Sequence, residues 1–453
     1  MVRKASVCRR SVVVGSAAAA AAAAVAPFTN RVAAQTSQVP ITIVINQSPW
    51  FNGFRGAVDA YEKATGNKVT LDVNPFAGSL EKQRNSVRAR EGQYDLLTMN
   101  GLFFVEFYQG GFLTPLHEID PDFKLEPQVA TFDDTPFWDA QTKTVNGMIG
   151  KLMGVPINPN IPLLYYRTDL YEQRGLKVPT TWDELLANAK ALHNPPTLYG
   201  MVQRGARETT GVTYDWFPYL WSFGGNLFRN EKQGDYTVVI NSPEARQALD
   251  YYLRLAKEAG HPNTGGQTQG QVIQNLLTGR AAHAILVIAA WQQMDDPTKS
   301  AVAGKIGFSV PPHAPDHMPA PPLGHFIGGI PRNVPKERQQ AALNFLRWFQ
   351  TYDAQVKYTE AGGPPVRFDV LASDMNKKPE FRWMKALGEG LKYSRQMWTV
   401  QEGAQLTAVF DLRLNQAVTG ELTSTGALNT IAGEIHDIMQ KGGYKTGRLP
   451  DLT

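Results

Sequence analysis

The hydrophobic and polar positions between residues 40 and 110 follow strand and helix patterns in turn. Ile41–Ile45 is an apolar run typical of a buried strand, and apolar residues from Phe54 to Tyr61 then recur at helical spacing before a stop at Gly66. The pattern continues with a strand at Lys68–Val73, a helix at Ser79–Gly92 and a strand at Tyr94–Met99. This order predicts the start of an open parallel α/β sheet.

Residues with strong capping preferences mark helix boundaries further along the chain. The segment Thr181–Glu184 predicts a capping box that opens a helix running to Leu192. Ser242, which precedes a proline, predicts another helix start, and Gly260 predicts its end. The proline-rich stretch His313–Pro322 predicts an irregular loop.

Three predicted strand ends carry an amide side chain close to an aromatic one. They are Asn46–Trp50, Asn74–Phe76 and Asn100–Phe103. Ligands of open α/β sheets bind beyond the carboxyl ends of the strands. Amides donate and accept hydrogen bonds as sugar hydroxyls do, and aromatic faces suit the C–H face of a sugar ring. Such residues also occur as turn asparagines and core aromatics, but their recurrence at three strand ends favours a carbohydrate site.

The first 34 residues have the pattern of a signal peptide. Arg9 and Arg10 precede an alanine-dominated apolar stretch, Val12–Val25, and Val32–Ala34 is typical of a cleavage site. A membrane anchor is the alternative, but the stretch is short and weakly hydrophobic for a bilayer span. The paired arginines favour the twin-arginine export route over the general secretory route, although a valine follows where a larger apolar residue is usual.

Composition indicates a soluble, exported protein. The chain has 453 residues, 43% of them hydrophobic and 19% charged, which fits two well-packed lobes. Five of the 45 Lys and Arg residues lie in the first 34 positions, so the mature chain is nearly neutral and gives no charge argument for nucleic acid. The only cysteine, Cys8, precedes the apolar stretch, which excludes disulfides and a lipid anchor. We therefore expect the protein in a Gram-negative periplasm.

Residues 151–192 carry the most specific motif of the chain. The motif consists of Lys151–Pro156, Leu163–Leu170, Gly175 and Pro179–Leu185. In these residues the chain resembles the family 1 extracellular solute-binding proteins of ABC importers. Arg167 departs from the family pattern, in which asparagine is common there. Because this position starts a turn, the expected fold is unaffected.

Further segments resemble the same family in the same order. They are Trp221–Gly225, Gly279–Ala282 leading to Trp291, Gly304–Pro311, Gly324–Gly329, Gly362–Arg367 and residues 405–444. The resemblance covers essentially the whole mature chain. It implies a two-lobed α/β fold of the periplasmic-binding-protein type II, with a ligand cleft between lobes that are joined by hinge strands.

The resemblance also implies a domain division and a mode of action. Lobe I would comprise residues 35–157 and 310–360, and lobe II residues 158–309 and 361–453, with hinges near Pro156–Pro162, Val310–Pro312 and Glu360–Pro365. A monomer of this kind would capture a sugar or polyol by closing its cleft. It would deliver the ligand to the transmembrane subunits of an ABC permease, without a cofactor.

The candidate ligand-binding residues combine aromatic platforms, hydrogen-bonding side chains and glycines of matched cleft loops. They are Trp50, Asn100, Phe103, Tyr165, Arg204, Trp216, Trp221, Trp291, Gly328, Gly329, Arg367 and Trp398. A single tryptophan is more often a core residue than a ligand platform, but Trp291 is the stronger candidate because it follows the buried strand Ala284–Ala290 and matches a family position. Arg204 and Arg367 could hydrogen-bond a sugar, pair with a carboxylate or phosphate, or lie in solvated loops.

Patterns for metal binding and catalysis are weak. His313 and His317 have helical spacing, but the prolines around them exclude a helix, and with His325 they give no metal site. Tyr165 and Tyr166, a pair that can bind ferric iron, would face opposite sides of a strand. There is no H-E-x-x-H, G-x-S-x-G, P-loop or G-x-G-x-x-G motif. A binding protein is therefore expected; the alternatives are a binding protein for a phosphorylated or anionic molecule and an exported carbohydrate-active enzyme.

Overall fold

The computed structural model describes residues 38–453. The predicted signal peptide, residues 1–34, and its twin-arginine motif lie outside the described residues. Within the described part, no helix combines the length and the apolar character that crossing a bilayer requires.

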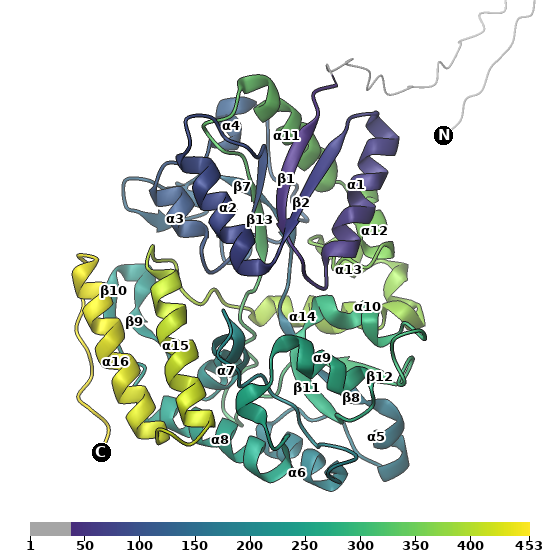
Figure 1. The fold of residues 1–453 in the computed structure, drawn as a ribbon, viewed down its shortest axis with the longest axis vertical. Coiled ribbons are helices and arrows are strands. Elements are labelled where there is room, and N and C mark those ends of the chain that lie inside the picture. The colour runs from purple at the N-terminus through teal and green to yellow at the C-terminus, as the bar shows by residue number, and fades with distance from the viewer. Residues whose placement is uncertain (1–37) are drawn as a thin grey trace, which may run out of the picture. The chain divides into compact units, whose positions relative to one another are not determined.

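The first lobe is built on a five-stranded sheet (Figure 1). In spatial order its strands are β2 (Val69–Asn74), β1 (Ile41–Asn46), β3 (Leu96–Asn100), β13 (Phe326–Gly329) and β7 (Gly154–Asn158). β1 pairs parallel with β2 and β3, which confirms the predicted parallel start of the sheet. β13 pairs antiparallel with both β3 and β7, so the sheet as a whole is mixed.

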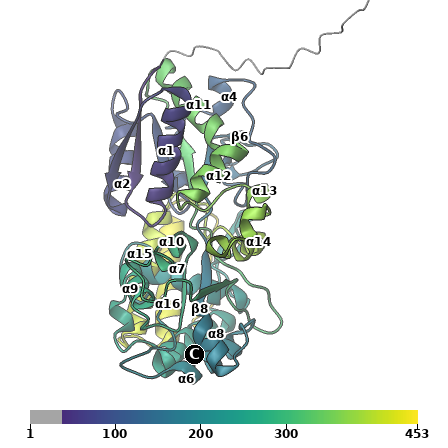
Figure 2. The ribbon, with the colours of Figure 1, turned by 90° about the vertical axis from the view of Figure 1, so that its right-hand side faces the viewer.

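Alternating apolar residues of β1 bury both faces of this sheet. Ile43 and Ile45 belong to a hydrophobic cluster with helices on one face, and Val44 belongs to a cluster with helices on the other. The first face is covered by α1 (Phe51–Thr65), α11 (Lys336–Phe349) and α12 (Tyr352–Glu360), the second by α2 (Phe76–Arg88) and α3 (Phe104–Gln109). Figure 2 shows α1, α11 and α12 together. The period-two pattern of a strand produces this arrangement.

The second lobe is built on a three-stranded antiparallel sheet and a large helical core. The strand order is β11 (His283–Val287), β8 (Pro162–Arg167) and β12 (Ile306–Ser309). The main helices are α6 (Trp182–Leu192), α7 (Gly211–Ser222), α8 (Pro243–Ala259), α15 (Gly403–Val418) and α16 (Ser424–Lys441). α15 packs against α16 and against α7 (Figure 1).

Shorter elements connect these layers. They are α4 (Leu116–Ile119), β4 (Phe137–Asp139), β5 (Thr144–Val145), β6 (Lys151–Leu152), α5 (Thr168–Arg174), β9 (Phe228–Asn230), β10 (Asp235–Val238), α9 (Gln269–Leu277), α10 (Trp291–Met294), α13 (Phe368–Leu371) and α14 (Met384–Tyr393). No helix or strand forms within the stretch His313–Pro322, which confirms the predicted irregular loop.

The predicted helix boundaries are confirmed where capping residues mark them. The Thr181 side chain accepts from the Glu184 amide and the Glu184 side chain bonds back, so α6 starts with a capping box. The Ser242 side chain caps α8, which ends at Gly260. Gly66 ends α1 with a left-handed φ of 74°, a conformation that glycine adopts without steric cost.

The chain crosses between the two sheets more than once. It leaves the first sheet at β7 for β8 and returns from β12 to β13. On the return, His313 bonds with Thr180 and Trp182, and Leu323 bonds with Arg395. Most of this connection therefore packs on the second lobe before β13 begins. The domain division expected from the sequence stays a prediction.

Candidate functional site

A cavity of about 320 Å³ lies at the carboxyl ends of the first-sheet strands. Asn46 ends β1 and Trp50 follows it, Phe76 opens α2 directly after β2, and Asn100 ends β3. All four residues line the cavity. The three strand ends thus converge on one place, because parallel strands end at the same edge of their sheet.

The second lobe supplies the opposite wall. Arg204, Thr210 and Tyr214 line the cavity from the segment that leads into α7 and from the first turn of that helix. Gln269 joins them from the start of α9, and Val287 from the end of β11. The cavity therefore has one wall from each lobe.

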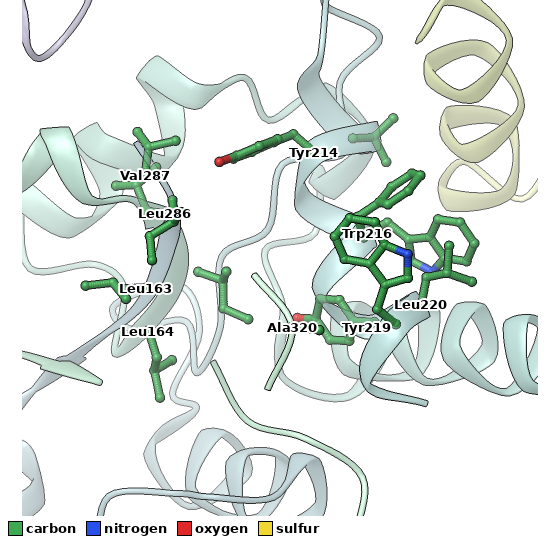
Figure 3. Packing of buried hydrophobic residues seen from close by; sticks show 14 of the residues in the cluster. Leu163, Leu164, Tyr214, Trp216, Tyr219, Leu220, Leu286, Val287 and Ala320 are labelled. Carbon is green, nitrogen blue, oxygen red and sulfur yellow. The ribbon is translucent and has the colours of Figure 1, made fainter. Parts of the chain in front are cut away.

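Tyr214 also ties this wall to the connections between the sheets. Its single hydroxyl hydrogen is shared between the carbonyls of Asn160 and Pro322, both at 2.9 Å from the hydroxyl oxygen. A side chain at Gly324 would place a Cβ 2.5 Å from the same hydroxyl, so glycine is required there. Figure 3 shows Tyr214 pointing toward the strand of Val287, while Trp216 leaves α7 on another side.

The lining is polar but carries little charge. Its amide and hydroxyl side chains are Asn46, Gln47, Ser48, Asn100, Asn160, Thr209, Thr210, Tyr214 and Gln269. Trp50, Phe76 and Phe326 add aromatic surface. Among the described residues that line the cavity, only Arg204 and Glu208 carry a charge. Such a wall can hydrogen-bond a hydroxyl-rich molecule and contact its apolar face.

Several buried polar atoms at the cavity have no hydrogen-bond partner among the described residues. They are Asn46 Oδ1, Ser48 Oγ, Trp50 Nε1 and Arg204 Nη2. Buried polar groups in folded proteins are nearly always satisfied by protein atoms or by ordered water, so these atoms are available to hydrogen-bond water or a ligand in the cavity.

Arg204 is held in a buried network beneath the cavity. Its Nε donates to Asp215 Oδ1 at 3.3 Å, its amide donates to Asp215 Oδ2 at 3.1 Å, and its Nη1 donates to Gln269 Oε1 at 3.1 Å. The guanidinium also lies 5.2 Å from the Tyr214 ring centroid. Burial raises the pKa of Asp215 to about 6 despite the nearby Arg204. The Arg204 charge is thus largely balanced within the protein.

Two further cavities adjoin the first. One of about 700 Å³ shares Gln47–Pro49 and Gln269 with it and is lined by Trp291. The other, of about 340 Å³, shares Ala77 and Glu208–Thr209 and is lined by Phe103. Because these three cavities share lining residues, they are together called the cleft below.

The structure brings five of the predicted site residues to this cleft. Trp50, Asn100 and Arg204 line the first cavity, while Phe103 and Trp291 line the adjoining ones. Trp291 is mostly buried, however, and its ring stacks on Trp383 with centroids 4.9 Å apart.

Four other predicted aromatic residues line none of these three cavities. Trp216 is fully buried beside Phe410, and Trp398 stacks on the same phenylalanine at 6.0 Å. The Tyr165 hydroxyl donates to the Val287 carbonyl at 2.8 Å inside the second sheet. Trp221 lines a separate cavity of about 300 Å³, where it lies under the guanidinium of Arg395.

The last three predicted residues occupy structural positions. Gly328 and Gly329 lie in strand β13, so the expectation of a cleft loop across Gly324–Gly329 is wrong for its second half. β13 is a central strand, and a Cβ at these glycines would meet Leu346 at 2.8 Å and Met99 at 2.5 Å. Arg367 pairs with Asp369 at 2.7 Å and donates to the Gln350 carbonyl at 2.8 Å.

Sequence reasoning missed Tyr214, Asn160, Gln269 and Phe326, which all line the first cavity. Asn160 lies in the predicted hinge segment, and the Thr268–Gln271 capping box of α9 could have marked Gln269. The start of α7 had no such signal, because its N-cap residue makes no side-chain cap.

No group of three or more potential metal ligands occurs among residues 38–453. His325 is fully buried, its Nε2 lies 2.8 Å from Thr135 Oγ1, and burial lowers its pKa to about 3. His313 Nδ1 lies 2.8 Å from the Ala314 carbonyl. These contacts give both histidines a structural role.

Comparison with known proteins identifies a family and several relatives of this chain. The family model of bacterial extracellular solute-binding proteins matches residues 46–356. A mannitol-binding protein of Pseudomonas aeruginosa is 25% identical over 285 residues, which are 62% of this chain and only 61% of the relative's length.

Solved structures agree with the fold described above. An ABC transporter solute-binding protein from Agrobacterium radiobacter K84 in complex with ribitol has a TM-score of 0.76 at 20% identity, and covers 89% of this chain and 99% of its own. Maltose-bound MalE3 of T. maritima also has a TM-score of 0.76, at 25% identity, covering 88% and 99%. These likenesses identify the fold as the two-lobed α/β type expected from the sequence.

Proposed function

Because the chain belongs to the bacterial extracellular solute-binding protein family, we propose that it captures an uncharged sugar or polyol for an ABC importer. The three-cavity cleft would hold the ligand, and closure of the two lobes would present the loaded protein to the permease subunits. The family's members are transport-binding proteins, and we propose binding and delivery here, without catalysis.

The observation that carries this proposal is the chemistry of the cavity wall. Nine amide and hydroxyl side chains line the first cavity together with the aromatic side chains of Trp50, Phe76 and Phe326. Stacking supplies affinity for the C–H face of a ring, and amides match hydroxyls as both donors and acceptors. The ligands named for the compared proteins, mannitol, ribitol and maltose, have this chemistry.

We propose Trp50, Asn100 and Arg204 as direct ligand contacts, together with Tyr214 and Gln269. Phe103 and Trp291 would contact parts of a ligand that reach into the adjoining cavities. The other predicted residues line none of the three cavities, and we assign them no contact with the ligand.

A phosphorylated or anionic ligand is the second candidate, because Arg204 Nη2 has no partner among the described residues. Two observations weigh against it. Asp215 already pairs with the guanidinium, and Glu208 adds a negative charge to the same cavity wall. A bound anion would therefore face a nearly balanced site.

The test is a calorimetric titration with mannitol, ribitol, maltose and a sugar phosphate at low and high salt. We expect one of the neutral compounds to bind with an affinity that salt hardly changes. Thermal unfolding provides a second readout, because ligand at a hundred times Kd should add about 2.7 kcal/mol of stability. Binding of the sugar phosphate alone, with affinity falling steeply as salt rises, would replace the neutral ligand by an anionic one.

We further propose a periplasmic monomer that is exported by the twin-arginine route and divided into lobes at the boundaries expected from the sequence. The support for export is the pair Arg9–Arg10 ahead of an apolar stretch. This localisation would place the protein beside the permease that it serves.

Replacing Arg9 and Arg10 together by lysine should leave the precursor in the cytoplasm, since the twin-arginine pathway reads this pair. Cell fractionation followed by immunoblotting measures the outcome, and a variant with Lys4 replaced by arginine serves as a control that keeps the pair. An unchanged yield in the periplasmic fraction would show that the general secretory route carries the protein.

A further inference from the structure

The helix α7, whose first turn lines the ligand cavity, begins without a cap of its own. Its N-cap residue, Thr210, has φ 68° and ψ 16°, and its side chain makes no capping bond. No acidic residue occurs in the first turn. A β-branched residue with positive φ is a backbone outlier that surrounding structure must hold in place.

Asp411 of α15 supplies the missing cap from a distant part of the chain. Its Oδ2 accepts from the Thr210 amide at 2.9 Å, and its Oδ1 accepts from the Thr213 amide at 3.2 Å and from the Thr213 hydroxyl. A carboxylate at this place satisfies free amides and suits the positive end of the helix dipole. Asp411 is almost fully buried.

The segment that Asp411 bonds, from Thr210 to Thr213, is continuous with the residues that line the first cavity. Thr209 and Thr210 line the cavity, and Tyr214 follows one turn later. Asp411 itself lines the adjoining cavity and not the first one. A loss of its bonds would free the segment and displace the cavity wall.

We propose that Asp411 is a positioning residue of the ligand cleft, and that ligand capture weakens when this carboxylate becomes protonated. The part of this inference that concerns ligand capture rests on the proposed function. Its other half, the order of the segment from Arg207 to Tyr214, concerns the ligand-free protein and stands independently.

The charges that face Asp411 come from three elements. Burial is the largest effect on Asp411 and raises its pKa to about 6, while the hydrogen bonds from Thr213 and Thr210 and, less strongly, the charge of Arg204 in the segment before α7 lower this pKa. Around the adjoining cavity lie Glu81 and Arg84 of α2 and Arg207 and Glu208 of the loop. Asp215, on α7 itself, also has its pKa raised to about 6 by burial.

The raised pKa of Asp411 makes a positioning role and a contribution to global stability predict opposite pH dependences. Protonated Asp411 is the form that the fold favours, so its contribution to stability is fully present below the ordinary value of 3.8 and is lost as pH rises through about 6. If Asp411 contributed only to global stability, its contribution to the free energy of unfolding would therefore be larger at pH 5 than at pH 7.5. Positioning predicts the opposite for the segment from Arg207 to Tyr214, because a neutral carboxyl is a weaker acceptor for two amides.

Hydrogen exchange of the ligand-free protein tests this directly. In the wild type, protection of the segment from Arg207 to Tyr214, corrected for intrinsic rates, should be lower at pH 5 than at pH 7.5. Asp411→Asn should lower protection about tenfold at pH 7.5 and remove its pH dependence. If the variant does not fold, the wild-type comparison alone decides. Equal or greater protection of this segment at pH 5 would overturn the proposal.

Asp95→Asn is the matched control. Asp95 is also buried, accepts from a backbone amide, that of Thr42 at 2.7 Å, and has its pKa raised by burial, but it lies in the first lobe and pairs with Arg338. This variant should lose stability without changing the exchange of the segment from Arg207 to Tyr214.

Titration with whichever of mannitol, ribitol and maltose binds the wild type completes the experiment. Asp411→Asn should weaken binding about tenfold at pH 7.5. If none of the three binds the wild type while exchange behaves as expected, the proposed ligand class is wrong and the positioning role stands. Unchanged affinity together with unchanged exchange would show that Asp411 does not position the wall.

Discussion

Replacing Arg204 by alanine should lower the free energy of unfolding by about 3–5 kcal/mol at pH 7.5 and abolish ligand binding. Arg204 and Asp215 are both buried, and removing the guanidinium leaves the carboxylate without its partner. Denaturant unfolding measures the stability, and calorimetric titration measures the binding.

The pH dependence of this loss follows from Asp215. Its pKa is already raised to about 6, so its contribution to stability is lost as pH rises through that value, and without Arg204 the pKa should rise further. The penalty of Arg204→Ala should therefore be smaller at pH 5 than at pH 7.5. Adding Asp215→Asn removes the unpaired charge and should recover part of the stability but none of the binding. A double variant that binds the ligand normally would exclude Arg204 as a ligand contact.

Replacing Trp50 by alanine should cost about 3–5 kcal/mol of stability and weaken ligand binding at least tenfold. Its indole packs on Phe54 and Phe326 with centroids 5.5 and 4.9 Å apart, and it also lines the cavity. The variant thus loses core packing and a ligand surface together. Titration at a temperature where the variant is fully folded isolates the effect on binding.

Trp216→Ala is the control for this substitution. Trp216 is as deeply buried as Trp50, so the two variants should lose similar stability. Because Trp216 lines none of the described cavities of the cleft, its loss should change the affinity much less. Equal losses of affinity in both variants would mean that the effect comes from general destabilisation.

Local patterns predicted much of the fold because they act over short stretches of sequence. The capping box at Thr181–Glu184 and the helix stop at Gly66 depend only on neighbouring residues, and both appear as expected. The pairing of β13 between β3 and β7 depends on contacts between residues far apart in sequence. No local pattern could place Gly328 and Gly329 in a central strand.

The candidate site could be predicted more fully on the first-lobe wall than on the opposite wall, where Arg204 is the predicted residue that lines the first cavity. Strand ends carry their own signal, and Asn46, Phe76 and Asn100 meet at the cavity as the parallel order requires. On α7, by contrast, Tyr214 lines the cavity whereas Trp216 is in the core, since residues two apart on a helix point to different sides. Choosing between them requires the rotation of the helix, which packing against distant α15 sets.

The shared hydroxyl of Tyr214 has a consequence for redesigning ligand preference. Its two bonds, to Asn160 and Pro322, fasten α7 to both connections between the sheets. If the lobes close as proposed, substitutions in α7 that reshape the wall would therefore also alter the energy balance between open and closed forms, so that ligand specificity and closure would change together. The segment Gln47–Pro49 lines both the first cavity and the adjoining one of about 700 Å³, and among the described residues no hydrogen bond ties its side chains to these connections, which makes it the better starting point for a library.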